Sequence, residues 1–563
     1  MIPRVIIAVV IAVVAATSYP GVVAVSMAVR LTPPTAAASP APPGQLPWLH
    51  VEHRQGFAPY ISDDQGRLVL LHGAAPASLL EFGRDAGSLP SSPPVYPLDP
   101  AAYDGSCPEV SAASRYPPLC QSDLIQMAAL GFNSLRLPLS WSLLEPERDQ
   151  FSQLYLARIA QVVDWARALG IYVIIDMHQN AYSPYVGPGD GVNLAYNSGA
   201  PAWATLTDGL PSRVLVKDQR EANPAVFEAF NNFWYNRNGI QEAYIEALGF
   251  LAKRFKDDSA VIGYSIFNEP QPGWNLPPGF EDLLLFPFYR RVIDALTGAH
   301  DGLPCPTGLF MPAICGHADL GIHDLRHLIF LEPGLLREIT DFPTHLGLPV
   351  SSYRNLVFDI HAYTHGYTIE ALLNPHADPS QATYPWGGYE QTYALGRREA
   401  KAMEAALFVS EFGGNPNHDS LILANELLQQ ERYLAGFAFW TWKENGGAGW
   451  GVYGPANNGG CLRAARERLL ARVYPRASGD PGLVYHYDPD TGGFTLTAKG
   501  PADGTPTVVF IPPEVRGSVA VSGTAMPETS TGADGSRLLT ASPSGGQFSI
   551  SVAPAPLVLS GCG

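Results

Sequence analysis

The chain has 563 residues, which exceeds the length of one ordinary domain. Hydrophobic residues make up 46% of it and charged residues only 15%, which excludes a disordered or coiled-coil protein. The net charge of −17, from 35 basic and 52 acidic residues, is unfavourable for binding nucleic acid. The composition therefore predicts a large folded core with no nucleic-acid partner.

Residues 1–30 indicate a targeting segment. Arg4 precedes a long apolar run, and Ala36 to Ala38 offers a small-residue cleavage site for a secretory signal peptide. A second interpretation stays open, because 5–29 contains no charge and is long enough to span a bilayer as an anchor. We therefore predict a secreted or N-terminally anchored protein. A linker rich in proline and alanine follows over 31–47.

From Trp48 onward, short apolar runs alternate with helical patterns such as those over 154–169 and 280–296. The runs have the length and the content of β-branched and aromatic residues that buried strands have. They lie at 68–73, 132–138, 171–178, 261–267, 328–333, 356–363, 407–413 and 436–442. Eight strand-then-helix units predict an α/β fold, a (β/α)₈ barrel over 48–475.

The pattern changes after the barrel. Short β-like runs between glycine and proline turns, such as 507–511, predict a small all-β sandwich over 476–563. Within the barrel, 83–120 and 299–326 are long insertions, and such insertions often shape a binding mouth.

The chain has six cysteines, an even number that favours disulfides if the protein is exported. Two pairs are close enough in sequence to close short loops, namely Cys107 with Cys120 and Cys305 with Cys315. Six cysteines allow 15 connectivities, so other pairings stay open.

Polar residues interrupt the apolar runs near their carboxyl ends. In a parallel barrel these ends meet on one face, where catalytic groups lie. One polar residue there is often a satisfied structural group, but such residues on five or six strands are difficult to explain by core packing. They are Arg136, His178, Asn268, Glu269, His361, Tyr363, Glu411 and Trp440.

Glu269 and Glu411 are the natural catalytic pair, because they end the fourth and seventh predicted strands, which face each other across a barrel mouth. A retaining glycosidase needs two carboxyls ~5 Å apart, one to protonate the leaving oxygen and one to attack the anomeric carbon. This chemistry needs no cofactor and no metal. The alternative from another class is a non-catalytic barrel that binds carbohydrate or lipid, and the two intact glutamates argue against it.

Three of the other residues are expected to act beside the pair. Asn268, next to Glu269, can bond the sugar 2-hydroxyl through its amide. Tyr363 can bond Glu411 and hold it ionised, and Arg136 can do the same by its charge.

The remaining residues are expected to bind substrate or support the site. His178 and His361 can position hydroxyls or tune the acid, and Trp440 can form the floor of the sugar site. Glu332, which ends the fifth strand, is expected at the rim, in contact with an arginine or with substrate. Three histidines within 317–327 include an i,i+4 pair that zinc sites use, but no glutamate follows in a zincin pattern, so we predict no metal site.

Taken in order, these motifs resemble glycoside hydrolase family 5, in the clan with its acid/base on strand four and its nucleophile on strand seven. The resemblance covers roughly residues 65–450. It lies in Asn-Ser-Leu-Arg136-Leu-Pro, Asp-Met-His178-Gln, Asn268-Glu269-Pro, His361-Ala-Tyr363, Glu411-Phe-Gly and Trp440. It implies that Glu269 is the acid/base and that Glu411 is the nucleophile.

Finer motifs are similar to the endoglycoceramidase and glycolipid-glycosidase branch. They are Ser140-Trp141 followed by Leu-Leu-Glu-Pro146, the stretch 175–183, and the all-β domain after the barrel. Enzymes of this branch cleave the β-glycosidic bond between a sugar and ceramide. The resemblance therefore implies a glycolipid or oligosaccharide substrate and contact with a membrane surface through that substrate. Rival substrates for the same mechanism are β-glucans, mannans and steryl glucosides.

Two further positions are expected to influence substrate choice. Endoglycoceramidases commonly carry aspartate after the Asp-Met-His-Gln motif, where this chain has Asn180, and that position is expected to touch the sugar. Trp274 lies in the loop just past Glu269 and is a candidate for the aglycone side.

Overall fold

The computed structural model describes eleven stretches of the chain. They are 45–81, 97–108, 116–186, 197–215, 220–275, 279–298, 314–344, 350–363, 388–444, 449–453 and 461–561. The predicted targeting segment, nearly all of the predicted linker and parts of both insertions lie outside these described residues. Within the described stretches, every helix is too short or too polar to cross a membrane.

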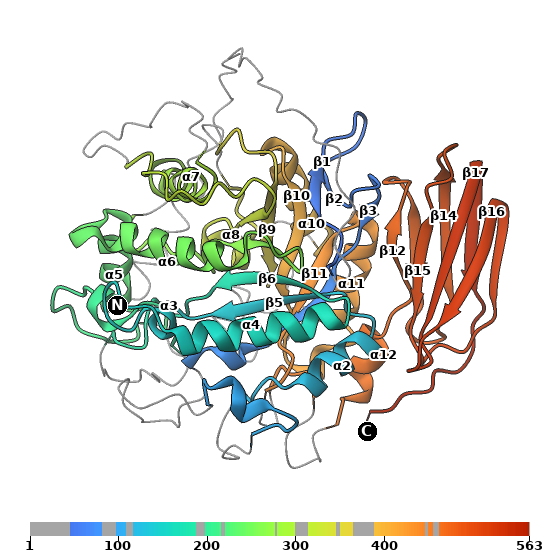
Figure 1. The fold of residues 1–563 in the computed structure, drawn as a ribbon, viewed down its shortest axis with the longest axis horizontal. Helices are drawn as coiled ribbons and strands as arrows, with labels where there is room; N and C mark the ends of the chain where they lie inside the picture. The colour runs from blue at the N-terminus through green and yellow to red at the C-terminus, as the bar shows by residue number, and fades with distance from the viewer. Residues whose placement is uncertain are drawn as a thin grey trace.

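Eight parallel strands close into a barrel, which confirms the predicted fold class (Figure 1). They are β4 (His72–Ala75), β5 (Ser134–Leu139), β6 (Tyr172–Met177), β7 (Val261–Ser265), β8 (Leu328–Leu331), β9 (Leu356–Ala362), β10 (Ala406–Phe412) and β11 (Gly436–Trp440). Pairing of β11 with β4 closes the barrel. Every residue of these strands is buried, because helices cover their outer faces and side chains fill the interior.

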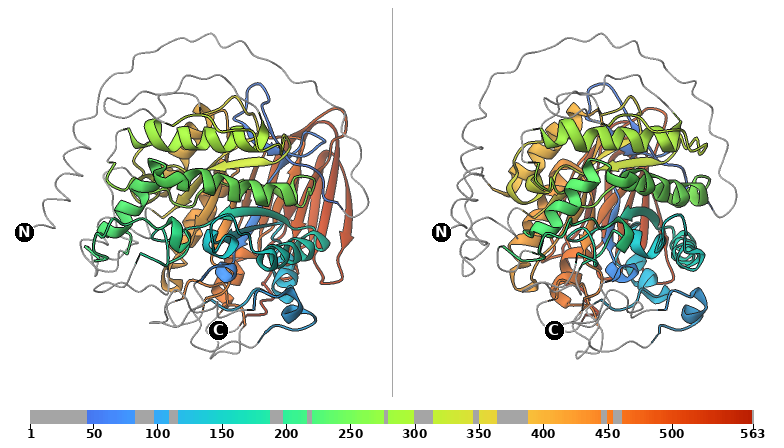
Figure 2. Two further views of the ribbon diagram at one scale, coloured as in Figure 1. Left: turned by 60° about the vertical axis from the view of Figure 1, so that its left-hand side comes forward. Right: turned by 90° about the vertical axis from the view of Figure 1, so that its left-hand side faces the viewer.

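Helices follow the strands and surround the barrel (Figure 2). They are α2 (Gln121–Ala129), α3 (Trp141–Leu144), α4 (Gln153–Ala168), α5 (Pro224–Trp234), α6 (Ile240–Phe255), α7 (Phe286–Thr297), α8 (Leu335–Thr340), α10 (Tyr389–Ala402), α11 (Ile422–Tyr433) and α12 (Ala464–Leu470). Side-chain caps fix where some of them begin: Ser152 accepts a hydrogen bond from the N–H of Tyr155 at the start of α4. The predicted helices over 154–169 and 280–296 are confirmed, and the second begins with a π turn over Glu281–Leu285.

The predicted first strand, 68–73, is divided between two sheets. Residues Leu68–Val69 form β3, which pairs antiparallel with β12 (Tyr474–Ser478), and the barrel begins only at His72. All four residues from 68 to 71 are apolar, so the pattern alone could not show where the chain leaves one sheet for the other. Leu70 packs in the core of the C-terminal sheet, whereas Leu71 packs in a cluster at the start of the barrel strands.

The C-terminal region forms an antiparallel sheet. Its strands are β12, β13 (Val484–Tyr487), β14 (Phe494–Gly500), β15 (Thr507–Ile511), β16 (Val519–Thr531) and β17 (Arg537–Val552), together with β1 (His50–Glu52), β2 (Tyr60–Ser62) and β3 from before the barrel. Buried and exposed residues alternate along β13 and β14, as expected where one face of a sheet is covered.

This sheet packs against the amino-terminal end of the barrel. Tyr474 stacks on His72 with 3.8 Å between ring centroids, and its hydroxyl donates a hydrogen bond of 2.8 Å to the carbonyl of Gly131. Apolar residues of β1 and β2 share a cluster with Tyr172 and Leu328, the first residues of two barrel strands. The carboxyl ends of the strands, where the candidate site lies, are at the opposite end.

The predicted disulfide between Cys107 and Cys120 is confirmed, with 5.6 Å between the two Cα atoms. Cys315 is also disulfide-bonded, and Cys305, its predicted partner, lies outside the described residues.

Candidate active site

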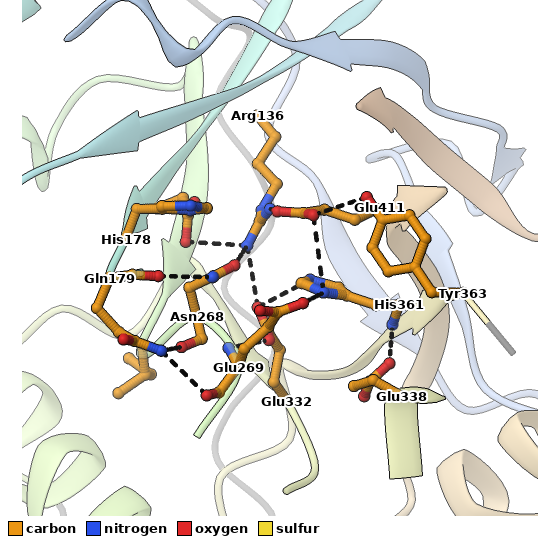
Figure 3. Close-up of polar contacts among 12 residues, drawn as sticks. Arg136, His178, Gln179, Asn268, Glu269, Glu332, Glu338, His361, Tyr363 and Glu411 are labelled. Carbon is orange, nitrogen blue, oxygen red and sulfur yellow. Dashed lines mark hydrogen bonds and ion pairs between the residues drawn. The ribbon is translucent and has the colours of Figure 1, made fainter. Parts of the chain in front are cut away.

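Polar side chains from six of the eight barrel strands converge at the carboxyl end of the barrel (Figure 3). Eight of the ten predicted site residues are brought together there: Arg136 on β5, His178 after β6, Asn268 and Glu269 after β7, His361 and Tyr363 on and after β9, Glu411 on β10, and Trp440 at the end of β11. The predicted set of strand-end residues is therefore one cluster in space.

The carboxyl groups of Glu269 and Glu411 lie close together beside His361. One oxygen of each glutamate and one ring nitrogen of His361 all lie within 4.8 Å of one another. Nδ1 of His361 is 3.0 Å from Glu269 Oε1 and 3.8 Å from Glu411 Oε2. This spacing fits the ~5 Å between carboxyls in retaining glycosidases and is too short for the ~6.5–9.5 Å of inverting enzymes.

Arg136 is fully buried, and its guanidinium group contacts several carboxylates of the site. One of its terminal nitrogens, Nη1, donates to Glu411, and Nη2 donates to Asn268 Oδ1 at 2.7 Å. Nη2 also lies 3.1 Å from Asp176 Oδ1 and 3.0 Å from Glu332 Oε1. Burial alone would lower the pKa of Arg136, but the surrounding carboxylates, with Asp176 the strongest, raise it above its ordinary value. The arginine is thus a permanent cation beneath the site.

Glu411 has two donors on its carboxylate, and they come from different strands. Oε1 accepts from Arg136, and Oε2 accepts a hydrogen bond of 2.9 Å from the hydroxyl of Tyr363. The side chain is almost fully buried. These contacts fix the direction of the carboxylate toward the space beside Glu269, as was expected for Tyr363 and Arg136.

Glu269 has a different environment, and its backbone is unusual. Its φ of 44° lies in the left-handed region, which is uncommon for residues other than glycine. Its N–H donates to Glu332 Oε2 at 2.7 Å, and Gln179 Nε2 donates to its carbonyl at 3.1 Å. Its carboxyl is partly exposed and meets His361. Hydrogen bonds therefore hold both the N–H and the carbonyl of Glu269.

The pKa values of His361 and Glu269 are shifted in opposite directions. Burial would lower the pKa of His361, but the charges of Glu332 and Glu411 hold it well above its ordinary value. Burial would raise the pKa of Glu269, but the hydrogen bond and the charge of His361 lower it. Both directions favour a His361 cation paired with a Glu269 carboxylate in the free protein.

Aromatic rings border the site. Trp440 stacks on His178 with 5.3 Å between ring centroids and an interplanar angle of 3°. His178 is in turn held by Asp176, whose Oδ2 is 2.9 Å from its Nδ1. Trp450, which was not among the predicted residues, lies 5.9 Å from Tyr363 between ring centroids. Faces of this kind suit the apolar faces of a sugar ring.

The two other predicted residues lie outside this cluster, and both contact the region of α5. The side chain of Asn180 accepts a hydrogen bond from Arg220. Trp274 is 49% exposed, and its indole N–H donates to Glu228 Oε2 at 2.7 Å. Their contacts with sugar and aglycone stay predictions.

Several residues of the cluster were not predicted or were placed differently. Asp176, Gln179 and Glu338 hold predicted residues, and each lies close in sequence to a singled-out residue or strand, which is the one signal that could have found them. The expected contact of Glu332 with an arginine is confirmed, since it bonds Arg136. Its expected place at the rim is wrong, because Glu332 is 1% exposed and lies beneath Glu269.

One group of side chains in the described part of the chain has metal-binding spacing. Glu269, His361 and Glu411 form the single group there whose atoms are close enough to hold a metal ion. His323 and His327 instead lie beside Asp319 and Asp324, at 3.4 and 2.7 Å.

Comparisons with known proteins find glycoside hydrolases that are similar to this chain. A family model described as cellulase (glycosyl hydrolase family 5) matches residues 109–296. Endoglycoceramidase I of Rhodococcus hoagii (strain 103S) is 24% identical over 466 residues, 81% of this chain and 79% of that protein. The crystal structure of an endogalactoceramidase superposes with a TM-score of 0.68 at 26% identity, covering 90% of this chain and all of that one. Endo-glycoceramidase II from Rhodococcus sp., in its lactosyl-enzyme intermediate, gives a TM-score of 0.65 at 25% identity, covering 88% of this chain and 99% of that one.

Proposed function

Because this chain is a glycoside hydrolase that resembles family 5 and its endoglycoceramidase branch, as its motifs predicted, we propose that it hydrolyses the β-glycosidic bond between the sugar and the lipid of a glycolipid, with retention of configuration. The single observation that carries the reaction is the spacing of two carboxyl groups. Glu269 and Glu411 offer oxygens within 4.8 Å of each other, and both approach Nδ1 of His361.

The different surroundings of the two glutamates support different roles. Glu411, held by Arg136 and Tyr363, is the nucleophile and attacks the anomeric carbon. Glu269, the more exposed of the two carboxyls, gives a proton to the leaving oxygen, so the C–O bond breaks and a glycosyl ester of Glu411 forms.

The second half of the reaction reverses the role of Glu269. It takes a proton from water, the water oxygen attacks the anomeric carbon, and Glu411 is released as a carboxylate. The contact of 3.0 Å between His361 and Glu269 is the path by which a proton on His361 reaches Glu269 for the first half, since the pKa of His361 is raised and that of Glu269 is lowered. Two displacements at the anomeric carbon return the sugar in its original configuration.

The substrate assignment is supported by the relatives. Endoglycoceramidase I of Rhodococcus hoagii matches this chain along most of its length, and the lactosyl-enzyme of Endo-glycoceramidase II shares its fold. We propose a glycosphingolipid as the substrate, with Asn180 and Trp274 on its sugar and lipid sides.

We further propose that the protein is exported and meets its substrate at a membrane surface. The charge-free apolar run within residues 1–30 supports export, because such runs direct secretion. The disulfide between Cys107 and Cys120 also supports it, since disulfides persist in oxidising compartments.

A substrate profile tests this assignment. We expect the full chain to release intact glycan and ceramide from glycosphingolipids in detergent micelles, with kcat/KM at least about 100-fold higher than on β-glucan or mannan oligosaccharides, because a site that uses the lipid loses transition-state binding when the lipid is absent. Products are measured by mass spectrometry, and E411Q prepared in parallel controls for contaminating glycosidases. Cleavage of oligosaccharides or steryl glucosides alone would contradict the glycosphingolipid, and cleavage of no β-glycoside would contradict the reaction.

A further inference from the structure

A third glutamate, Glu332, lies behind the catalytic pair. It follows β8 and is 1% exposed, so it has no access to substrate. Its Oε2 accepts from the N–H of Glu269 at 2.7 Å, and its Oε1 accepts from Arg136 Nη2 at 3.0 Å. The same Oε1 lies 3.4 Å from Nε2 of His361. One buried carboxylate thus contacts three residues of the site (Figure 3).

We propose that Glu332 is a positioning residue of the reaction, which holds the backbone of Glu269 in its left-handed conformation and keeps the proton of the His361–Glu269 pair in place. This proposal rests on the proposed function, because it assigns Glu332 a part in the proton transfer of that same site. Glu332 touches no reacting atom and acts entirely through its neighbours.

The backbone contact decides where the carboxyl of Glu269 lies. Glu269 comes after the end of β7, so its N–H has no partner in the barrel ladder and donates to Glu332 instead. A left-handed φ of 44° at a residue with a side chain persists where its surroundings hold it. Glu332 holds the N–H and Gln179 holds the carbonyl, so loss of Glu332 frees one side of the turn.

The ring of His361 is held between two carboxylates. Nδ1 lies 3.0 Å from Glu269 Oε1 and Nε2 lies 3.4 Å from Glu332 Oε1, so each ring nitrogen has a carboxylate beside it. The neutral ring would leave one nitrogen without a proton to donate. This arrangement favours the imidazolium, which presents its Nδ1 proton to Glu269.

Other charged groups also surround His361, and they come from five barrel strands and from α8. They are Glu269 after β7, Glu338 on α8, Asp359 on β9, Glu411 on β10, Asp176 on β6 and Arg136 on β5, in addition to Glu332. Among the groups that raise the pKa of His361, Glu332 has the largest effect. Removing the charge of Glu332 should therefore lower the pKa of His361, so that His361 loses its proton at a lower pH.

The chemistry of Glu332 requires a carboxylate. Two donors bond it, the N–H of Glu269 and Nη2 of Arg136, and Nε2 of His361 lies 3.4 Å away. A glutamine has the same shape but carries an NH₂ group in place of one oxygen, so it must turn two donor hydrogens toward one of these donors. The variant E332Q therefore keeps the volume and removes both the charge and one acceptor.

The test compares E332Q and E332D with wild type on an activated aryl β-glycoside and on the natural glycolipid. We expect E332Q to lose about 100-fold in kcat on the glycolipid with little change in KM, because a misplaced acid costs about this much. We expect its activity to be lost at a pH about one unit lower than in wild type as pH rises, because a neighbouring negative charge no longer retains the proton. E332D keeps the charge, so its pH profile should stay near that of wild type although its kcat falls.

The matched control is E426Q. Glu426 on α11 is equally buried and bonds Tyr393 at 2.6 Å, away from the site residues, so the same chemical change there should leave kcat and the pH profile unchanged. Thermal unfolding of each variant shows whether it is folded.

If E332Q is folded and behaves as E426Q does, or loses activity with an unshifted pH profile, the proposal is wrong. If E332Q does not fold, E332D provides the test. A shift of the basic limb of the pH profile of E332D would then contradict the proposal. If wild type hydrolyses no β-glycoside, the proposed function has failed instead.

Discussion

The variant E411Q is expected to lose about 10⁵-fold or more in kcat on every β-glycoside, because an amide cannot attack the anomeric carbon. In the described structure, Glu411 is the carboxylate that Arg136 and Tyr363 direct toward Glu269. The loss should be the same for activated and natural substrates, since the nucleophile is needed whatever the leaving group. Steady-state kinetics on an aryl glycoside and on a glycolipid measure it.

A chemical rescue identifies the role of Glu411 more specifically. With the smaller variant E411A, added azide should enter the space that the carboxylate leaves and attack the anomeric carbon once, giving an α-glycosyl azide from a β-glycoside. NMR of the product reports its configuration, and E426Q with azide is the control. A β-glycosyl azide from E411A, or near-normal hydrolysis by E411Q, would contradict the assignment of the nucleophile.

The variant E269A is expected to show a loss that depends on the leaving group. On a glycolipid, whose lipid alcohol needs a proton to leave, kcat/KM should fall by about 10³-fold, within the usual range for general acid catalysis. On an aryl glycoside with a good leaving group, kcat/KM should change little, because formation of the glycosyl-enzyme needs no acid there. Hydrolysis of the glycosyl-enzyme still lacks a general base in this variant. A burst of released phenol should therefore precede slow turnover.

Azide again gives the control within the same protein. It needs no base, so it should speed turnover of E269A and give the β-glycosyl azide, the opposite configuration to that from E411A. Equal losses on the aryl glycoside and the glycolipid would contradict the acid role. The two variants together therefore separate the acid/base from the nucleophile by product configuration.

Much of the site was predictable because two simple rules act together. Apolar runs become buried strands, and parallel strands in a barrel end on the same face. Glu269 and Glu411, 142 residues apart in the chain, were therefore paired from sequence alone, as were Arg136 and Tyr363 around them. The same rules say little about loops, and Asn180 and Trp274 lie on loops, where they contact Arg220 and Glu228 rather than the strand-end cluster.

The other features of the site depend on how neighbouring strands are aligned and on the turns that follow them. The pattern of one sequence does not show either. A shift in pairing between Val409 and Glu411 sets Glu411 directly beside His361 of the neighbouring strand. Glu332 was visible at a strand end, but its burial beneath Glu269 follows from the left-handed turn after β7. The uninterrupted apolar run from 68 to 71 likewise hid the change from one sheet to the other.

The central claim is a covalent glycosyl-enzyme on Glu411, and trapping that intermediate tests it most directly. An activated 2-deoxy-2-fluoro β-glycoside should inactivate the folded protein, because fluorine slows both steps while a good leaving group restores the first. Peptide mass spectrometry should then find the 2-fluoroglycosyl group on the peptide that contains Glu411 and on that residue. Labelling of Glu269 or another residue, or no adduct in a sample that hydrolyses the parent aryl glycoside, would contradict the mechanism.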